Sequence, residues 1–389
     1  MHLKIFMWSY IVTALSLVVA FIYGSWEAVV LCMILGVLEV SLSFDNAVIN
    51  ATVLVRMSDF WQKIFLTVGI LIAVFGMRLL LPLVIVWLAA GLPPVQAFQL
   101  ALNPPADGAA YFPDGSPSYE TLLTDAHPLI AAFGGMFLLM LFLSWLFEER
   151  EHTWLSWLEK PLARAGRLDA MAVLVACVVL LVVSETLAED PETVLFSGLL
   201  GLVTYLAVNG LGTLFENPDE EEIPQDVDHD SVPAPSSAAK SGVTQLARAT
   251  GKAGFFLFLY LEVLDASFSF DGVIGAFAIT ADPILIALGL GFIGAMFVRS
   301  LTVLLVRKGT LSEYVYLEHG AHWAIGALAF ILMISIGVHI SEFITGLIGV
   351  AFIGASFLTS IRRNRRLATE EVDVGTVTPE RYPSTPPAI

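Results

Sequence analysis

The chain has 389 residues, of which 57% are hydrophobic and only 14% are charged, and its formal net charge at pH 7 is -17. An ordinary soluble domain carries about 25% charged residues, so the composition excludes water-soluble enzymes and favours an integral membrane protein. The acidic balance also excludes a basic nucleic-acid surface, and the two cysteines, Cys32 and Cys177, lie in apolar segments that suggest neither a disulfide framework nor a thiolate metal site.

Apolar stretches long enough to cross a membrane recur along nearly the whole sequence. A spanning helix needs roughly 20 apolar residues, and about ten stretches qualify: 5–24, 27–55, 62–90, 128–147, 169–187, 193–215, 253–280, 283–306, 320–339 and 342–361. If these spans alternate, Lys and Arg gather in the connections on one side, and the opposite connections contain none. By the positive-inside rule, we expect an all-α polytopic membrane protein with both termini in the cytoplasm.

The connections divide the chain into segments. The stretch 103–117 is rich in Pro, Gly and Asp and predicts an irregular loop, and 149–167 mixes Trp with charges, as an interfacial helix does. The acidic, Pro- and Ser-rich stretch 217–245 predicts a disordered linker. We therefore expect a first membrane repeat over 1–215, an acidic cytoplasmic linker over 216–250, a second membrane repeat over 251–361 with 193–215 as its first span, and a disordered tail over 362–389.

An acidic, serine-rich motif occurs in the second span and again in the seventh. The first copy is Glu39-Val-Ser-Leu-Ser-Phe-Asp45-Asn46, and the second is Asp265-Ala-Ser-Phe-Ser-Phe-Asp271-Gly272. Each half then holds five spans, and because five is odd the two halves are predicted to be inverted in the membrane. Inverted repeats are typical of secondary transporters, whose substrate site lies near the midplane between the halves.

The motif acids lie deep in their spans. At about 1.5 Å per residue, Asp45 lies about 16 Å from Arg56, and Asp271 lies about 16 Å from Asp282. An ionised carboxylate at that depth costs at least ~2.5–3.5 kcal/mol, so the acids need partners. Arg78 in the third span and Arg299 in the eighth are the candidates for charge balance.

The motif acids, Glu262 and the two arginines lie at similar depth in the spans and are called the acid layer below. Their charges predict a cationic substrate. Glu39, Asp45, Asp265 and Asp271 against two arginines leave a charge of about -2 by the formal count, and Glu262 would make it about -3. The candidate ligands are Asp45, Asp271, Glu39, Asp265, Asn46, Ser43 and Ser269, with Glu262, Ser41 and Ser267 as possible accessory residues. Oxygen ligands of this kind favour Mg²⁺, Ca²⁺ or Mn²⁺ over Zn²⁺ or Cu²⁺.

Helical spacing leaves the shape of the site open. Glu39, Ser43 and Asn46 share one helix face, as do Asp265 and Ser269, whereas Ser41 with Asp45 and Ser267 with Asp271 share a second face. Either two cavities are lined, or the helices unwind at the motif, which Gly272 and Gly275 would permit.

Plainer interpretations stand beside the functional one. The four motif serines could be small residues that allow close helix packing, and the acids could be structural partners of the arginines. Arg299 could extend its head toward the membrane surface. His127 and His319 favour interfacial helix starts over metal ligands.

With these motifs in view, the chain resembles the TerC family of bacterial integral membrane proteins, and most closely its branch described as domain of unknown function 475 (DUF475). The resemblance covers roughly residues 25–360 and rests on the two motif copies. It implies a protein of the bacterial plasma membrane linked to metal-ion homeostasis, with manganese export as the best-developed role and an association with tellurium resistance. Glu39, Asp45 and Asn46 take the place of the family's first acidic motif, and Asp271 takes the place of the second.

The sequence-based hypothesis is a secondary transporter that exports a divalent cation, with Mn²⁺ as the expected cargo and a proton as a possible coupling ion. No tightly bound cofactor and no enzymatic activity are expected. The alternative is a membrane scaffold in metal insertion or stress resistance, for which the acidic linker is the candidate docking segment. The oligomeric state is left open.

Overall fold

The computed structural model describes residues 2–105, 109–150, 152–166, 170–216, 249–277, 279–280, 282–307, 313–340 and 342–375, and within them the chain is almost entirely helical. The first part contains α1 (His2–Leu42), α2 (Phe44–Arg56), α3 (Asp59–Ile64), η1 (Phe65–Gly69), η2 (Ile72–Leu80), α4 (Leu81–Ala90), α5 (Pro94–Leu102) and α6 (Tyr119–Asp125). It continues with α7 (His127–Leu146), α8 (Ser156–Ala165), α9 (Met171–Thr186) and α10 (Pro191–Glu216). The last part contains α11 (Gly251–Phe277), α12 (Pro283–Ile286), η4 (Ala287–Gly294), α13 (Ala295–Arg307), α15 (Leu317–Ser335) and α16 (Glu342–Gly375).

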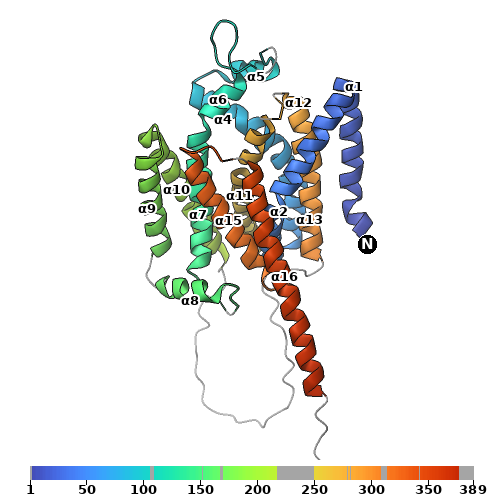
Figure 1. Cartoon of the computed structure of the whole chain (residues 1–389), viewed down its shortest axis with the longest axis vertical. Coiled ribbons are helices and arrows are strands. Elements are labelled where there is room, and N and C mark those ends of the chain that lie inside the picture. Colours follow the sequence, from blue (N-terminus) through green and yellow to red (C-terminus); the bar gives the residue numbers. More distant parts are fainter. Residues whose placement is uncertain are drawn as a thin grey trace, which may run out of the picture.

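These helices make the chain a multi-span membrane protein. Within the described residues, six helices are long and apolar enough to cross a membrane: Ile5–Val40, His127–Leu146, Pro191–Gly210, Pro283–Val306, Leu317–Ser335 and Ile344–Leu367. A seventh candidate is the pair Asp59–Gly69 and Ile72–Trp87, whose two parts are bent by 47°. Figure 1 shows most of these helices side by side, with α5 and α6 at one end of the bundle and α8 at the other.

The first helix folds back on itself. A straight helix of 36 residues would be about 54 Å long, whereas the hydrocarbon layer is about 30 Å thick. The backbone leaves the helical region at Gly24 (φ -143°, ψ 24°) and Ser25 (φ 61°, ψ -153°). Figure 1 shows the two arms of α1 meeting at this break and running back along the bundle. The first arm of α1 therefore supplies the first predicted apolar stretch, and the second arm together with α2 supplies the second.

The interior of the bundle is built around α7, which packs against α10, α15, α11 and α9. Most of its side chains are buried, including Met136, Phe137 and Leu138. Close approach depends on glycines, as is common in membrane bundles. A Cβ on Gly201 of α10 would lie 2.3 Å from the Phe133 carbonyl oxygen, and a Cβ on Gly135 would lie 2.9 Å from the Met333 sulfur.

A break in the motif helices, one of the two alternatives that the sequence leaves open, is found in the first copy only. Ser43 lies between α1 and α2 with φ -98° and ψ 16°. The Ser43 amide still donates to the Glu39 carbonyl and the Ala47 amide donates to the Ser43 carbonyl, so the break is a local kink. The second copy lies within α11, which stays helical through Gly272 and Gly275. Unwinding at these two glycines is therefore not observed.

Two connecting segments bear on the sequence predictions. The stretch 149–167 contains α8, and the predicted linker 217–245 lies outside the described residues.

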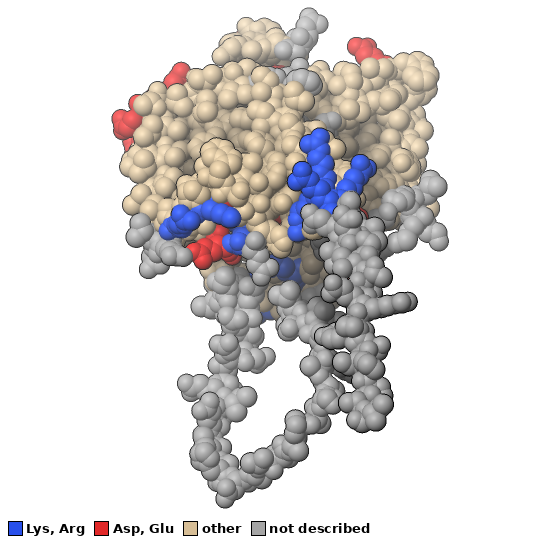
Figure 2. All heavy atoms as spheres, turned by 60° about the horizontal axis from the view of Figure 1, so that its bottom comes forward, with Lys and Arg blue, Asp and Glu red and all other residues tan. Residues whose placement is uncertain are grey.

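The tail differs from the prediction, because α16 continues to Gly375 and residues 362–375 are helical. This part of the tail contains no Gly or Pro before Gly375, and Arg366 and Glu370 stand one helical turn apart with opposite charges, which favours a helix. Figure 2 shows Lys and Arg side chains gathered on the side from which α16 projects.

Candidate functional site

The two motif copies meet in the interior of the bundle. Asn46, at the start of α2, donates a hydrogen bond from Nδ2 to Oδ1 of Asp265 on α11, over 2.7 Å. Asn46 is 3% exposed and Asp265 is 8% exposed, so the bond lies away from solvent. This contact joins the first motif to the second across 219 residues of sequence. The side chains of Asp45, Asp271 and Ser41 lie outside the described part of the structure.

Glu39 forms a buried ion pair with Arg78. The Arg78 Nη2 group donates to Glu39 Oε1, and Ser43 Oγ donates to the same oxygen over 2.7 Å. The Arg78 Nη1 group donates to the Ala73 carbonyl over 2.8 Å. Glu39 is 1% exposed and Arg78 is 5% exposed. The first motif acid is thus neutralised by the arginine that the sequence nominated for this role.

Two glycines enclose the Glu39 side chain. A Cβ on Gly294 of η4 would lie 2.1 Å from Glu39 Cγ and 2.6 Å from its Cβ. A Cβ on Gly272 of α11 would lie 3.0 Å from Glu39 Oε2. Gly272 is the position at which the second motif departs from Asn46 of the first. The departure has a physical reason, because a larger residue there would press on the carboxylate of the other copy.

The enclosure gives a stability prediction. Gly294→Ala should lower the free energy of unfolding by about 1–3 kcal/mol, since the added methyl group overpacks the Glu39 side chain. Thermal unfolding in detergent measures the effect. Gly354→Ala is the control, because a Cβ on Gly354 would have no atom within 4 Å. Equal stability of the two variants would contradict the packing around Glu39.

A second group of polar atoms surrounds a cavity of about 40 Å³ between α2, η1, η2, α11 and α13. Asn50, Glu262 and Asp265 line it, together with Gly69 and the two arginines Arg78 and Arg299. Both carboxylate oxygens of Glu262, Oδ2 of Asp265 and Oδ1 of Asn50 are buried without a hydrogen-bond partner among the described residues. Buried polar atoms without partners are rare and costly, so this cavity is the unsatisfied part of the layer.

The remaining candidate site residues from the sequence, Arg299, Ser267 and Ser269, make other contacts. Arg299 donates from Nε to the Leu66 carbonyl over 3.0 Å. Ser267 donates to the Val263 carbonyl of its own helix, and a Cβ on Gly134 would lie 3.8 Å from it, which favours the packing interpretation for this serine. Ser269 is buried, and its hydroxyl has no partner among the described residues.

Two residues of the layer were missed by sequence reasoning. Asn50 follows Asn46 by four residues and therefore lies on the same helix face, so its spacing was the available signal. Gly69 contacts the acid layer because a Cβ there would lie 2.7 Å from Glu262 Oε1. No sequence signal indicated it, since it stands in an apolar run without a polar neighbour on its face. Within the described residues, no group of three or more His, Cys, Asp or Glu side chains is arranged to hold a metal ion.

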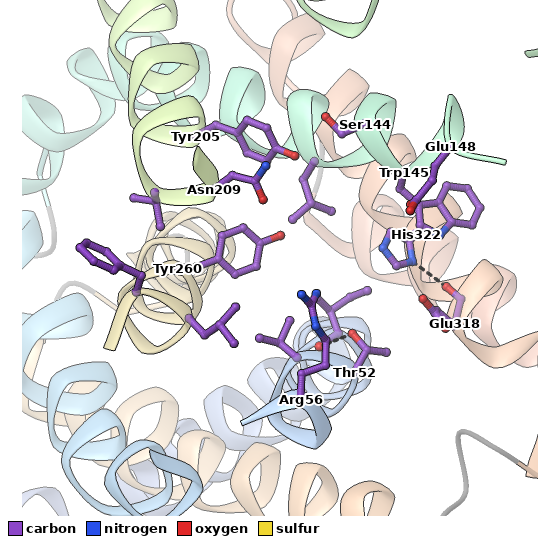
Figure 3. Close-up of a pocket in the computed structure, with 16 residues that line it drawn as sticks. Thr52, Arg56, Ser144, Trp145, Glu148, Tyr205, Asn209, Tyr260, Glu318 and His322 are labelled. Atoms are coloured by element: carbon purple, nitrogen blue, oxygen red, sulfur yellow. Dashed lines mark hydrogen bonds between the residues drawn. The ribbon is translucent and has the colours of Figure 1, made fainter. Parts of the chain in front are cut away.

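A larger pocket of about 450 Å³ lies between α2, α7, α10, α11 and α15. Figure 3 shows Arg56, Tyr205, Tyr260 and Asn209 around its open centre, with Glu148, Glu318 and His322 on one side. Neighbouring residues of α2 and α11 face the two cavities: Ile49 lines the large pocket and Asn50 the small one, and Tyr260 lines the large pocket and Glu262 the small one. The α2–α11 pair is therefore the wall between them.

A buried carboxylate fastens α8 to the bundle. Glu159 accepts hydrogen bonds from Trp323 Nε1 over 3.1 Å and from the Trp154 and Leu155 amides, and its Oε2 lies 3.3 Å from His319 Nδ1. Burial alone would raise the pKa of Glu159, but these hydrogen bonds lower it from the usual 4.5 to about 2. His319 is thus a structural partner at a helix start, as the sequence favoured, and is placed away from the acid layer.

Because the pKa of Glu159 is lowered, the docking of α8 should weaken as the pH falls. A carboxylate whose folded-state pKa is lowered stabilises the folded state fully above its unfolded value, and the stabilisation is lost as the pH falls through the folded value. We expect α8 to be docked at pH 6 and to be increasingly released between about pH 4.5 and 2. Hydrogen exchange of residues 152–166, corrected for its intrinsic pH dependence, measures this. Glu159→Gln should expose the segment at every pH, and equal protection of the wild-type protein at pH 6 and 2.5 would contradict the assignment.

Comparison with known proteins identifies a family and no close relative. The family model described as protein of unknown function, DUF475, matches residues 44–367. The match covers α2 and α11, and hence Asn46, Asn50, Glu262 and Asp265. None of the curated proteins matches the chain, and none of the solved structures does.

Proposed function

The chain belongs to the DUF475 family, and we propose that it is a secondary transporter that exports a divalent metal cation, with Mn²⁺ as the expected cargo. The family description assigns no activity, so the proposal rests on the acid layer and on the resemblance of both motif copies to the TerC family. The chain is expected to act in the bacterial plasma membrane and to catalyse no chemical reaction.

The observation that carries the proposal is the joined acid layer itself. Glu39, Glu262 and Asp265 are buried among apolar helices of a membrane protein, and Asn46 links the two motif copies. Charged groups in such surroundings are costly and usually mark the path of an ion or substrate. Oxygen ligands without thiolates favour a hard divalent cation.

The proposal includes ten spans in two inverted halves: spans one to five, which end at residue 187, and spans six to ten, which run from residue 193 to residue 361. The linker 216–250 lies inside the second half, between its first and second spans. Reciprocal packing supports it: α1 packs on η4, as α11 packs on η2, and α2 packs on α15, as α11 packs on α7. Each proposed half also contains a π-helical stretch in its third span, η2 in one and η4 in the other. Such stretches are rare and frequently lie at functional sites. The basic side chains in Figure 2 support placing the α8 end in the cytoplasm.

Alternating access follows from this arrangement. The cation would leave the cytoplasm through the large pocket of Figure 3, whose lining includes Trp145 and Glu148 at the end of α7 that leads to α8. Movement of one half against the other around the acid layer would then expose the site to the opposite side. Arg78 and Arg299 would neutralise the acids when the cation is absent, which keeps the empty protein stable during its return.

Metal flux into proteoliposomes that contain the purified protein tests this function. The expected result is saturable uptake of Mn²⁺ that empty liposomes lack and that Asp45→Asn and Asp271→Asn reduce. Unchanged flux in these two variants would contradict the acidic motifs as the pathway. Absence of flux in the wild-type protein would contradict transport and favour the scaffold alternative.

A further inference from the structure

The acids of the layer are not equivalent, and their hydrogen bonds separate them. Glu39 already has partners, because its Oε1 accepts hydrogen bonds from Arg78 and Ser43. Gly272 and Gly294 pack closely around the rest of the side chain. Only one oxygen of Asp265 has a hydrogen-bond partner: Oδ1 accepts from Asn46, and Oδ2 has no partner within the described residues. Glu262 is buried to 94% and both of its oxygens lack a partner there.

The atoms without partners point to one place. Oε1 and Oε2 of Glu262, Oδ2 of Asp265 and Oδ1 of Asn50 belong to three residues that line the same cavity of about 40 Å³. Asn50 is 3% exposed, and Asp265 is 8% exposed. Four acceptor oxygens around one cavity repel one another when both acids are ionised, and a cation, a proton or a donor molecule placed between them removes that cost. The wall also carries one buried donor without a partner among the described residues, Nε of Arg78.

The size of the cavity limits its occupant. The cavity of about 40 Å³ has room for roughly three water-sized particles, because a single water needs about 10–15 Å³ of such volume. A hydrated cation with a full shell of waters does not fit, whereas an ion that has exchanged most of its waters for protein oxygens does. Ca²⁺ and Mg²⁺ are bound in proteins in this way by carboxylate and amide oxygens.

The cavity is lined by two acids, which would balance a divalent ion, and by two arginines, which oppose it. Glu262 and Asp265 contribute two negative charges when ionised, and no other acid lines the cavity among the described residues. The two arginines on its wall face it as well: Arg78 is held by Glu39 and the Ala73 carbonyl, and Arg299 is held by the Leu66 carbonyl. Their positive charges weaken binding, which suits a carrier that must release its ion.

We propose that a largely dehydrated divalent cation binds in this cavity through Glu262, Asp265 and Asn50, with Glu262 as its principal ligand. The inference rests on the proposed transport function and assigns its binding step. It places the site among residues of α2, η1, η2, α11 and α13, and its ligands Glu262 and Asn50 lie outside the repeated motif. Glu39 then serves as the structural partner of Arg78, and Gly69 leaves the room that the Glu262 carboxylate needs.

Equilibrium binding of MnCl₂ to the purified full-length protein in detergent tests the site, with free Mn²⁺ followed by electron paramagnetic resonance. Loss of an outer-shell partner already costs about 10–100-fold in metal affinity, so Glu262→Gln should cost at least about 100-fold. Gly69→Ala keeps every ligand but places a methyl group 2.7 Å from Glu262 Oε1, and it should weaken binding at least about tenfold. Glu185→Gln, which removes an exposed acid near the end of α9 that lines neither cavity, is the control and should leave the affinity unchanged.

The possible results distinguish an error in the proposed cation site from an error in the proposed transport function. Folded Glu262→Gln and Gly69→Ala variants that bind Mn²⁺ like the wild-type protein would overturn the site, and so would a loss of affinity in Glu185→Gln equal to theirs. If Glu262→Gln does not fold, Gly69→Ala and Glu262→Asp decide by the same criterion. Wild-type flux together with normal binding by these variants would contradict the site alone. Absence of both flux and binding in the wild-type protein would contradict the transport function as well.

Discussion

Arg78→Met is expected to lower the free energy of unfolding by about 3–5 kcal/mol, the largest stability effect of any single substitution in the acid layer. Removing the guanidinium leaves the Glu39 carboxylate buried at 1% exposure with Ser43 as its only hydrogen-bond donor among the contacts described. A buried charge without its partner costs far more than the pair contributes. Chemical unfolding in detergent, followed by circular dichroism, measures the loss.

The double variant Glu39→Gln/Arg78→Met is the control for this prediction. Neutralising both partners removes the uncompensated charge, so the double variant should recover much of the stability that the single variant loses. Wild-type stability in Arg78→Met would contradict the ion pair. A double variant no more stable than Arg78→Met would show that the loss comes from packing around the guanidinium.

Asp265→Asn is expected to reduce Mn²⁺ transport by roughly 100-fold, by analogy with the loss of a metal-site group, while the protein stays folded. An asparagine has nearly the same shape, and its carbonyl oxygen can still accept the hydrogen bond from Asn46 Nδ2. The substitution therefore removes the negative charge, and with it an ionic ligand, but keeps the link between the two motif copies. Initial rates of uptake into proteoliposomes measure the effect.

Ser267→Ala is the matched control in the same motif copy. The Ser267 hydroxyl donates to a carbonyl of its own helix and packs near Gly134, so its loss should leave transport within about twofold of wild type. Normal transport by Asp265→Asn, or an equal loss in Ser267→Ala, would contradict the role of the Asp265 charge.

Much of the architecture could be predicted from the sequence. Each of the ten apolar stretches overlaps a helix, because long runs of apolar residues leave the backbone no other way to satisfy its hydrogen bonds in lipid. The pairing of Arg78 with a motif acid and the meeting of the two motifs were also predicted, since buried charges need partners. Ten spans and the inverted topology remain predictions.

The finer features of the layer depend on packing between distant segments. The kink falls at Ser43, where no glycine or proline marks it, and α11 stays helical through Gly272 and Gly275 of its motif copy. Gly272 enlarges the space for Glu39, and Gly69 enlarges the space for Glu262, across contacts that no spacing along one helix reveals. Glu262 was only an accessory candidate because it lies outside the repeated motif. The helix of α16 beyond residue 362 was missed because its charged composition was taken as a sign of disorder.

The most direct test of the proposed cation site is an anomalous difference map from crystals of the protein grown with Mn²⁺. We expect one strong peak within coordination distance, about 2.0–2.6 Å, of oxygens of Glu262 and Asp265 in the wall between α2 and α11. A peak in the large pocket beside Glu148 and Glu318, or at the protein surface with the acid layer empty, would contradict it.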